Sequence, residues 1–189
     1  MYIFRKRENT QVEEPSCELF SFTYSLILKK NAMQFLDFSP SLATDFERIN
    51  REWIEAMFVL EPIDEQVIGD PQTFIINRGG YIWFVADDAG EIVGTCALMK
   101  KADGVFELTK MGVSASARGK KVGEALLRHV LTKAPTIAFN SLFLLTNTRC
   151  EAAIHLYEKL GFRHDSAIMD TYGGAYSRCD VAMRYSGNV

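Results

Sequence analysis

The chain has 189 residues, of which 48% are hydrophobic and 24% are charged, and its formal net charge is −3. These values are typical of one globular domain with a substantial core, and the weak negative charge gives no general attraction to nucleic acid or to an anionic membrane. The four cysteines and three histidines form no C-x-x-C pair and no cluster at zinc-ligand spacing, so the sequence predicts no metal site.

Residues 1–32 differ from the rest of the chain, because a polar stretch is followed by a short apolar and aromatic run. The run over residues 19–28 is too short to cross a bilayer, and no cleavage pattern follows it. We therefore predict no signal peptide and a cytoplasmic location. Residues 1–32 are either an N-terminal extension of uncertain order or the source of an added strand or dimer contact. A single domain is predicted over residues 33–189.

From residue 33 onward the apolar residues recur either at period two or at helical spacing, which separates strands from helices. Ser39 and Pro40 mark a helix start, Gly69 and Pro71 interrupt a second helix, and Gly161 ends a later one. The predicted strands cover residues 33–38, 81–86, 91–99, 105–113, 142–146, 162–169 and 178–185. The predicted helices cover residues 40–58, 61–76, 118–133 and 153–160.

These elements predict the architecture. Three consecutive strands over residues 81–113 are joined by short turns and form an antiparallel meander. The continuous apolar strand over residues 142–146 is typical of the middle of a sheet. The predicted fold class is α+β, with a mixed, mostly antiparallel central sheet of about seven strands and helices on both faces. An exposed last strand, together with residues 19–28, would allow a homodimer.

Residues 111–123 join a strand to a helix through a loop of small and polar residues. The first N–H groups of a helix have no partner within it and carry the positive end of its dipole, so they can bind a diphosphate. Gly119 and Gly123 allow close approach because they have no side chain. The Walker A and G-x-G-x-x-G patterns both fail here, which leaves an anion site or a plain helix start. Basic residues add positive charge: Arg118, Lys120 and Lys121.

Residues 118–123, R-G-K-K-V-G, resemble the core signature (Q/R)-x-x-G-x-(G/A) of the GNAT-type N-acetyltransferase superfamily, with Lys121 where the family usually has glycine. Residues 150–162 resemble the family's N-x-x-A-x-x-L-Y-x-x-x-G-F helix, with Cys150 at the asparagine position. Asn147 could cap this helix or contact the cofactor instead. The order of the elements over residues 33–186 also fits the family.

The resemblance implies an enzyme that moves the acetyl group of acetyl-CoA to a primary amine of a small molecule or an amino acid, by direct attack of the amine. Backbone groups of Met111 and Val113 are expected to hold the pantetheine, and a backbone N–H of this strand to polarise the thioester carbonyl. The implied acetyl-CoA contacts are Met111, Val113, Arg118, Gly119, Lys120, Lys121, Val122, Gly123 and Asn147.

Two residues match catalytic positions of the family. Glu107 is the implied general base, acting directly or through water, and Tyr157 is the implied proton donor to the leaving thiolate. Each has a structural alternative. Glu107 could form an ion pair with Lys110 or with a neighbouring strand, and Tyr157 could simply pack on the apolar face of its helix.

The acceptor pocket is expected between the first two helices and the last strands. Arg178 could hold a carboxylate bidentately, Glu61 could hold an ammonium group, and Trp53 could line the pocket. Two alternative functions stay open: a non-catalytic acyl-CoA-binding sensor or regulatory domain, and a protein-lysine or N-terminal acetyltransferase. The sequence does not identify the acceptor amine.

Overall fold

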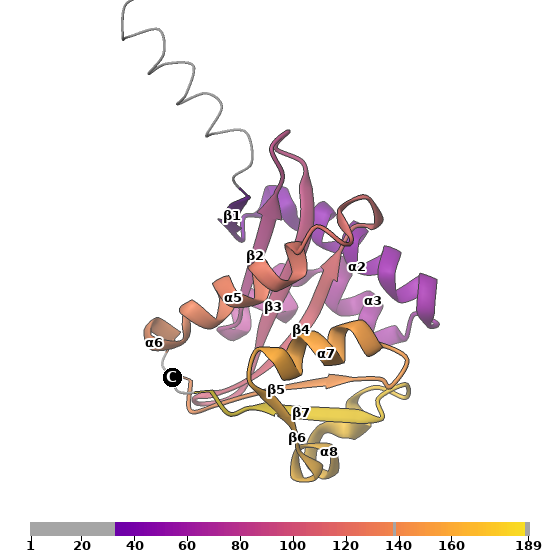
Figure 1. Ribbon diagram of the computed structural model, residues 1–189, viewed down its shortest axis with the longest axis vertical. Helices are drawn as coiled ribbons and strands as arrows, with labels where there is room; N and C mark the ends of the chain where they lie inside the picture. The colour runs from indigo at the N-terminus through magenta and orange to yellow at the C-terminus, as the bar shows by residue number, and fades with distance from the viewer. Residues whose placement is uncertain (1–32, 138, 188–189) are drawn as a thin grey trace, which may run out of the picture. The chain divides into compact units, whose positions relative to one another are not determined.

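The computed structural model describes residues 33–137 and 139–187, so the predictions for residues 1–32, including the strand or dimer contact at 19–28, lie outside the described residues. Within the described part, seven strands form one sheet in the order β1-β2-β3-β4-β5-β7-β6 (Figure 1). The strands are β1 (Gln34–Asp37), β2 (Tyr81–Ala86), β3 (Ile92–Ala102), β4 (Val105–Val113), β5 (Ser141–Thr146), β6 (Phe162–His164) and β7 (Val181–Tyr185).

Every strand pairing is antiparallel except that of β4 with β5. The predicted α+β fold, with a mostly antiparallel sheet, is confirmed. The α-helices are α2 (Ala43–Met57), α3 (Pro62–Gly69), α4 (Pro71–Phe74), α5 (Val122–Thr132), α6 (Ala134–Ile137), α7 (Glu151–Lys159) and α8 (Ser166–Tyr172). Short 3-10 helices are η2 (Pro40–Leu42), η3 (Ile76–Arg78), η4 (Ala115–Ala117) and η5 (Gly173–Ala175).

Helices cover both faces of the sheet. Successive side chains of a strand point to opposite faces, and β5 shows this directly. Leu142 and Leu144 belong to the core beneath α5 and α7, whereas Phe143 packs with Ile168 of α8. The other main core, which includes residues of α2 and α3, lies on the face away from α5 (Figure 1). The central strands are therefore buried on both sides.

Two predictions for the C-terminal part are wrong. The sequence predicts a strand over residues 162–169, but β6 ends at His164, and Asp165 then caps α8 by accepting the backbone N–H of Ile168 at 3.0 Å. This local hydrogen bond starts a helix where the apolar pattern indicated a strand. The last strand is also not an exposed edge, because β7 pairs with β5 on one side and with β6 on the other.

The sheet opens between β4 and β5. Their pairing stops at Leu108 and Leu144, although β4 continues to Val113. Beyond this point the last residues of β5 pair only with β7 among the described strands. Figure 1 shows β4 and β5 diverging, with α7 beside the gap. The final residues of β4 thus present a backbone edge without a partner strand on the β5 side.

A β-bulge distorts β4 at the same level. Thr95 of β3 pairs with Gly112 and Ala97 pairs with Thr109, so one residue of β3 faces two residues of β4. An unequal count of this kind defines a bulge and changes the direction in which backbone groups point. Lys110 lies in the bulge with φ 49°, a left-handed conformation that is uncommon outside glycine.

A buried cluster of charges ties this bulge to α3 and to the segment before β7. Nζ of Lys110 lies 2.6 Å from Oδ1 of Asp64, and both side chains are at most 2% exposed. Arg178 donates to both carboxylate oxygens of Asp64, at 2.6 and 2.9 Å. Burial by itself would raise the pKa of Asp64, but the hydrogen bonds from Arg178 and the charge of Lys110 outweigh it and lower the pKa.

We predict that Asp64→Asn lowers the free energy of unfolding by about 3–5 kcal/mol at neutral pH, because it leaves the Lys110 ammonium buried without its counter-charge. The pKa of Asp64 in the fold is below its ordinary 3.8. The advantage of the wild type is therefore complete above that value and is lost as the pH falls through the lower folded pKa. Urea denaturation at a series of pH values measures both effects.

The matched control is Asp45→Asn, which breaks the solvent-accessible ion pair of Asp45 with Arg48 on α2. A surface pair of this kind contributes less than about 1 kcal/mol. An equally small loss in both variants would show that the Asp64 cluster does not stabilise the fold.

Candidate active site

A cavity of about 830 Å³ lies where β4 and β5 separate. The end of β4 lines it, together with the start of α5, the start and middle of α7 and the end of α2. Most residues that the sequence predicted for the site lie in this lining. They are Trp53, Met111, Val113, Arg118, Gly119, Lys121, Val122, Gly123, Asn147, Tyr157 and Arg178.

Helix α5, whose first residues line the cavity, begins at Val122, later than the predicted start near residue 118. The 3-10 turn η4 comes first, and Lys121 then takes the N-cap position with φ 61°. Glycine adopts this conformation without strain, whereas a residue with a side chain loses about 1 kcal/mol or more. Lys121 therefore adopts the left-handed backbone conformation that suits the glycine usual at this position of the signature.

The N-terminus of α5 is open toward the cavity. No side chain caps it, so its first backbone N–H groups have no side-chain partner. A Cβ added to Gly123 would lie 3.6 Å from Met111 and from Val113, and 3.8 Å from Leu156 of α7. The missing side chain of Gly123 thus faces the space between β4 and α7, as expected for the approach of a ligand.

Ion pairs organise the charges around this helix start. Glu124 lines the cavity and binds Lys159 of α7 at 2.7 Å and Arg128 at 2.9 Å. The hydrogen bonds from Lys159 and Arg128 lower the pKa of Glu124 to about 2. Arg118 donates to the backbone carbonyl of Val113 at 3.4 Å and forms an ion pair with Glu52 at 3.6 Å. The negative charge of Glu124 is therefore offset, and a cation links the two helices that border the cavity.

Tyr157 and Met111 meet across the cavity. The Tyr157 hydroxyl lies 3.9 Å from the Met111 sulfur, a weak acceptor, and Tyr157 is 7% exposed. Burial, followed by the nearby Cys96 and Cys150, raises the pKa of Tyr157. The hydroxyl therefore keeps its proton at neutral pH, and Tyr157 lines the cavity.

Glu107 lies outside the lining of the cavity. It is 1% exposed and pairs with Lys101 of the adjacent strand β3, with Nζ 3.1 Å from Oε2. This is the neighbouring-strand pairing that the sequence left open, whereas Lys110 pairs with Asp64 instead. Because Glu107 does not line the cavity, its carboxylate can reach an acceptor amine there only through an intervening group. Lys120 is also absent from the cavity lining.

Asn147 orders the loop before α7. Its side-chain N–H donates to the carbonyl of Arg178 at 2.7 Å, and its side-chain oxygen accepts the backbone N–H of Arg149 at 2.9 Å. The N-cap residue of α7 is Cys150, which makes no side-chain cap. The Asn147 amide thus connects the loop before α7 to the segment before β7.

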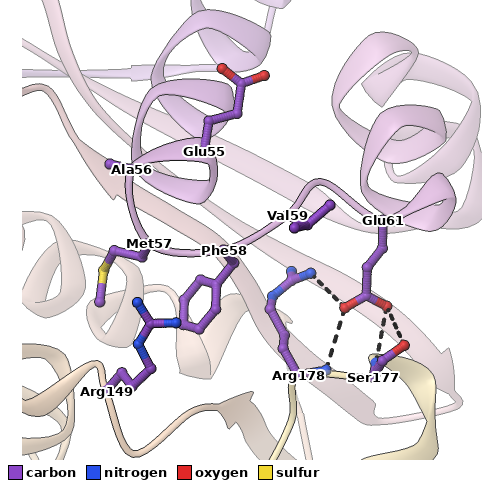
Figure 2. Close-up of a pocket in the computed structure, with 9 residues that line it drawn as sticks. All are labelled: Glu55, Ala56, Met57, Phe58, Val59, Glu61, Arg149, Ser177 and Arg178. Carbon is purple, nitrogen blue, oxygen red and sulfur yellow. Dashed lines mark hydrogen bonds and ion pairs between the residues drawn. The ribbon is translucent and has the colours of Figure 1, made fainter.

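A second cavity, of about 680 Å³, lies next to the first and shares Phe58, Arg149 and Arg178 with it. Figure 2 shows the Phe58 ring between the guanidinium groups of Arg149 and Arg178. Glu61 accepts hydrogen bonds from Ser177 at 2.9 Å and from Arg178 at 2.9 Å. The two residues predicted to hold the acceptor, Glu61 and Arg178, therefore bind each other.

Sequence reasoning missed three charged residues around these cavities: Asp64, Lys110 and Arg149. Asp64 had a local signal, since an acidic residue three positions after the helix start completes a capping box. Lys110 gave no signal, because a bulge depends on the register of two strands. Arg149 lies directly before α7 but reaches Phe58, which is far away in the sequence.

Other kinds of site find no support in residues 33–137 and 139–187. Within these ranges, no three His, Cys, Asp or Glu side chains lie close enough together to hold a metal ion. The helices of the same ranges are too short or too polar to cross a membrane.

Comparison with known proteins finds a family match over part of the chain. The model of the acetyltransferase (GNAT) domain matches residues 79–164. N-acetylaspartate synthetase of Xenopus tropicalis is 36% identical over 102 residues, which are 53% of this chain and 38% of that protein. The N-acetyltransferase YjgM of Escherichia coli (strain K12) is 29% identical over 112 residues, 58% of this chain and 66% of that protein.

The chain therefore spans less than two thirds of the length of these relatives. Among solved structures, an acetyltransferase of the GNAT family from Staphylococcus aureus Mu50 has the same fold. The TM-score is 0.73 at 18% identity, over 82% of this chain and 98% of that one. Residues 79–164 therefore match the GNAT domain of N-acetyltransferases, and the chain shares the fold of a GNAT acetyltransferase.

Proposed function

We propose that the protein is an N-acetyltransferase that moves an acetyl group from acetyl-CoA to the amine of a small molecule or an amino acid. The observation that carries this proposal is the cavity where β4 leaves β5, with the bulge, the uncapped start of α5 and the Tyr157 hydroxyl around it. The names of the relatives agree with this reaction, and one names an N-acetylated amino acid as its product.

The described residues fit acetyl-CoA. The first N–H groups of α5 and the nearby cations suit a diphosphate. The end of β4, from Thr109 to Val113, has no partner strand on the β5 side and can pair with the amide groups of the pantetheine. Such an arrangement directs the thioester toward Met111 and Tyr157, which face each other.

The reaction needs three contributions from the chain. The acceptor nitrogen attacks the thioester carbon, and a backbone N–H at the bulge stabilises the negative charge that develops on the carbonyl oxygen. The carbon–sulfur bond then breaks, and the Tyr157 hydroxyl gives its proton to the leaving sulfur. Glu107 takes up the proton of the attacking amine through a water molecule, since Glu107 does not line the cavity.

The two alternatives have less support. A sensor that only binds acyl-CoA has no need for the buried Tyr157 hydroxyl, to which we assign protonation of the leaving thiolate. An open acidic groove would favour acetylation of protein lysines or N-termini, whereas the lining of the second cavity is mixed, with Arg149 and Arg178 beside Glu55 and Glu61.

The proposal also includes the cellular location of the protein and its oligomeric state. Among the described cysteines, Cys96, Cys150 and Cys179 are free, which agrees with the reducing conditions of the cytoplasm. A single domain over residues 33–189 and a homodimer stay predictions, although the last strand, which is paired on both sides, no longer supports the dimer. Cell fractionation and size-exclusion chromatography of the full chain would contradict them by showing a membrane-bound or strictly monomeric protein.

Thiol release from acetyl-CoA by the purified full chain tests the function. We expect release of free CoA to depend on an added amine, with amino acids and small amines as the panel and lysine peptides as the comparison. Mass spectrometry should find one added acetyl group on the accepted amine. Tight acetyl-CoA binding without turnover across the whole panel would favour the sensor.

Tyr157→Phe should lower kcat at least about tenfold and leave the Kd for acetyl-CoA within about twofold, because the change removes a proton donor but keeps the ring. The control is Tyr172→Phe, because Tyr172 stacks on Phe143 and lines neither cavity. Wild-type turnover in Tyr157→Phe would show that Tyr157 only packs.

Glu107→Gln should lower kcat about 100-fold at neutral pH. The difference in kcat between wild type and Glu107→Gln should shrink as the pH rises, because more of the acceptor amine is then already unprotonated. Lys101→Met removes the same ion pair but keeps the carboxylate, so its kcat should stay within about threefold of wild type. Equal losses in the two variants, independent of pH, would reduce Glu107 to a structural partner of Lys101.

A further inference from the structure

Two guanidinium groups lie on either side of one aromatic ring where the two cavities meet. Arg149 lies 5.0 Å and Arg178 lies 5.7 Å from the centre of the Phe58 ring (Figure 2). Both arginines line both cavities. Two cations beside one ring repel each other unless anions compensate their charges. The carboxylates that pair with each arginine therefore determine which arginine can still bind an anionic ligand.

The charge of Arg178 is compensated within the chain. Arg178 donates to Asp64 at 2.6 and 2.9 Å and to Glu61 at 2.9 Å, and its side chain is 16% exposed. An arginine held bidentately by one carboxylate and contacted by a second has few free donors. Arg178 therefore acts as a positioning residue that holds one side of Phe58.

Arg149 differs from Arg178 in this respect. In the described part of the chain its guanidinium contacts the Phe58 ring, and no carboxylate lies within ion-pair distance of it. The two glutamates that line the second cavity do not pair with Arg149. Glu61 is bound by Ser177 and Arg178. Glu55 pairs with Arg51 at 3.2 Å and points away from Phe58 (Figure 2). Arg149 thus keeps its planar set of donors available to a ligand.

The backbone holds Arg149 in place. The amide of Asn147 accepts its backbone N–H, and α7, which carries Tyr157, begins two residues later. The backbone of Arg149 is therefore fixed just before the helix that carries Tyr157, while its exposed side chain lines both cavities. An anion bound by Arg149 would lie where the two cavities meet.

We propose that Arg149 binds a carboxylate of the acceptor, so that the preferred acceptors are amines that carry a free carboxylate, such as amino acids. The inference rests on the proposed acetyl transfer and names the substrate class of that site. The planar guanidinium matches a carboxylate bidentately, and Phe58 fixes the plane in which this pairing occurs.

The test compares amino acids with the corresponding amino acid amides as acceptors, using the full chain and acetyl-CoA. For wild type we expect a lower KM for the free acids than for the amides. Arg149→Gln should raise the KM of the free acids by about 10- to 100-fold, as for loss of a charged hydrogen bond, and change the KM of the amides by less than about twofold. Arg149→Lys should lie between the two, because lysine keeps the charge but loses the bidentate geometry.

Arg78→Gln is the matched control. Arg78 also lies 5.0 Å from an aromatic ring, that of Phe74, but it lines neither cavity. This variant should keep wild-type KM values for every acceptor.

Three outcomes would overturn the inference: a wild-type preference for amides, an equal loss for acids and amides in Arg149→Gln, or a rise in the KM of acetyl-CoA instead of the acceptor. If no amine is turned over, calorimetric titration of the protein saturated with CoA decides. Binding of amino acids but not amides, lost in Arg149→Gln, would support the carboxylate site while the transferase proposal fails. Equal or absent binding of acids and amides would overturn the carboxylate site as well.

Discussion

The loss of pairing between β4 and β5 beyond Leu108 and Leu144 is the constraint on which the site depends. Backbone N–H and C=O groups in a protein interior need partners, and here the neighbouring strand supplies none. The open strand edge borders a cavity in which a ligand or water can supply these partners. The same separation leaves room for α5 and α7 to approach each other, and Lys159 and Glu124 connect them.

The buried charges of the chain maintain this opening. Lys110 lies in the bulge that redirects β4, and its ammonium reaches Asp64 at the start of α3, while Arg178 brings the segment before β7 to the same carboxylate. One acidic residue thus holds three elements around the cavity. A cluster of this kind contributes little net stability compared with an apolar core, but removal of one member leaves an uncompensated buried charge.

The two cavities meet at a shared set of side chains. The start of α5 and Tyr157 line the first cavity only, whereas Phe58, Arg149 and Arg178 line both. In an acidic chain with net charge −3, the cations that matter are local ones. Arg178 is compensated by two carboxylates, which is why the proposed acceptor site is assigned to Arg149.

The sequence by itself determined the three-strand meander, β4 at Val105–Val113, the presence of a helix after the loop that contains Gly119, and the place of Tyr157 on its helix. These features follow from local spacing, caps and glycines. It did not determine the bulge, the partner of Glu107 or the contact of Arg149 with Phe58. Those depend on strand register and on contacts between segments far apart in the chain, which local patterns do not encode, and only the tertiary structure decided them.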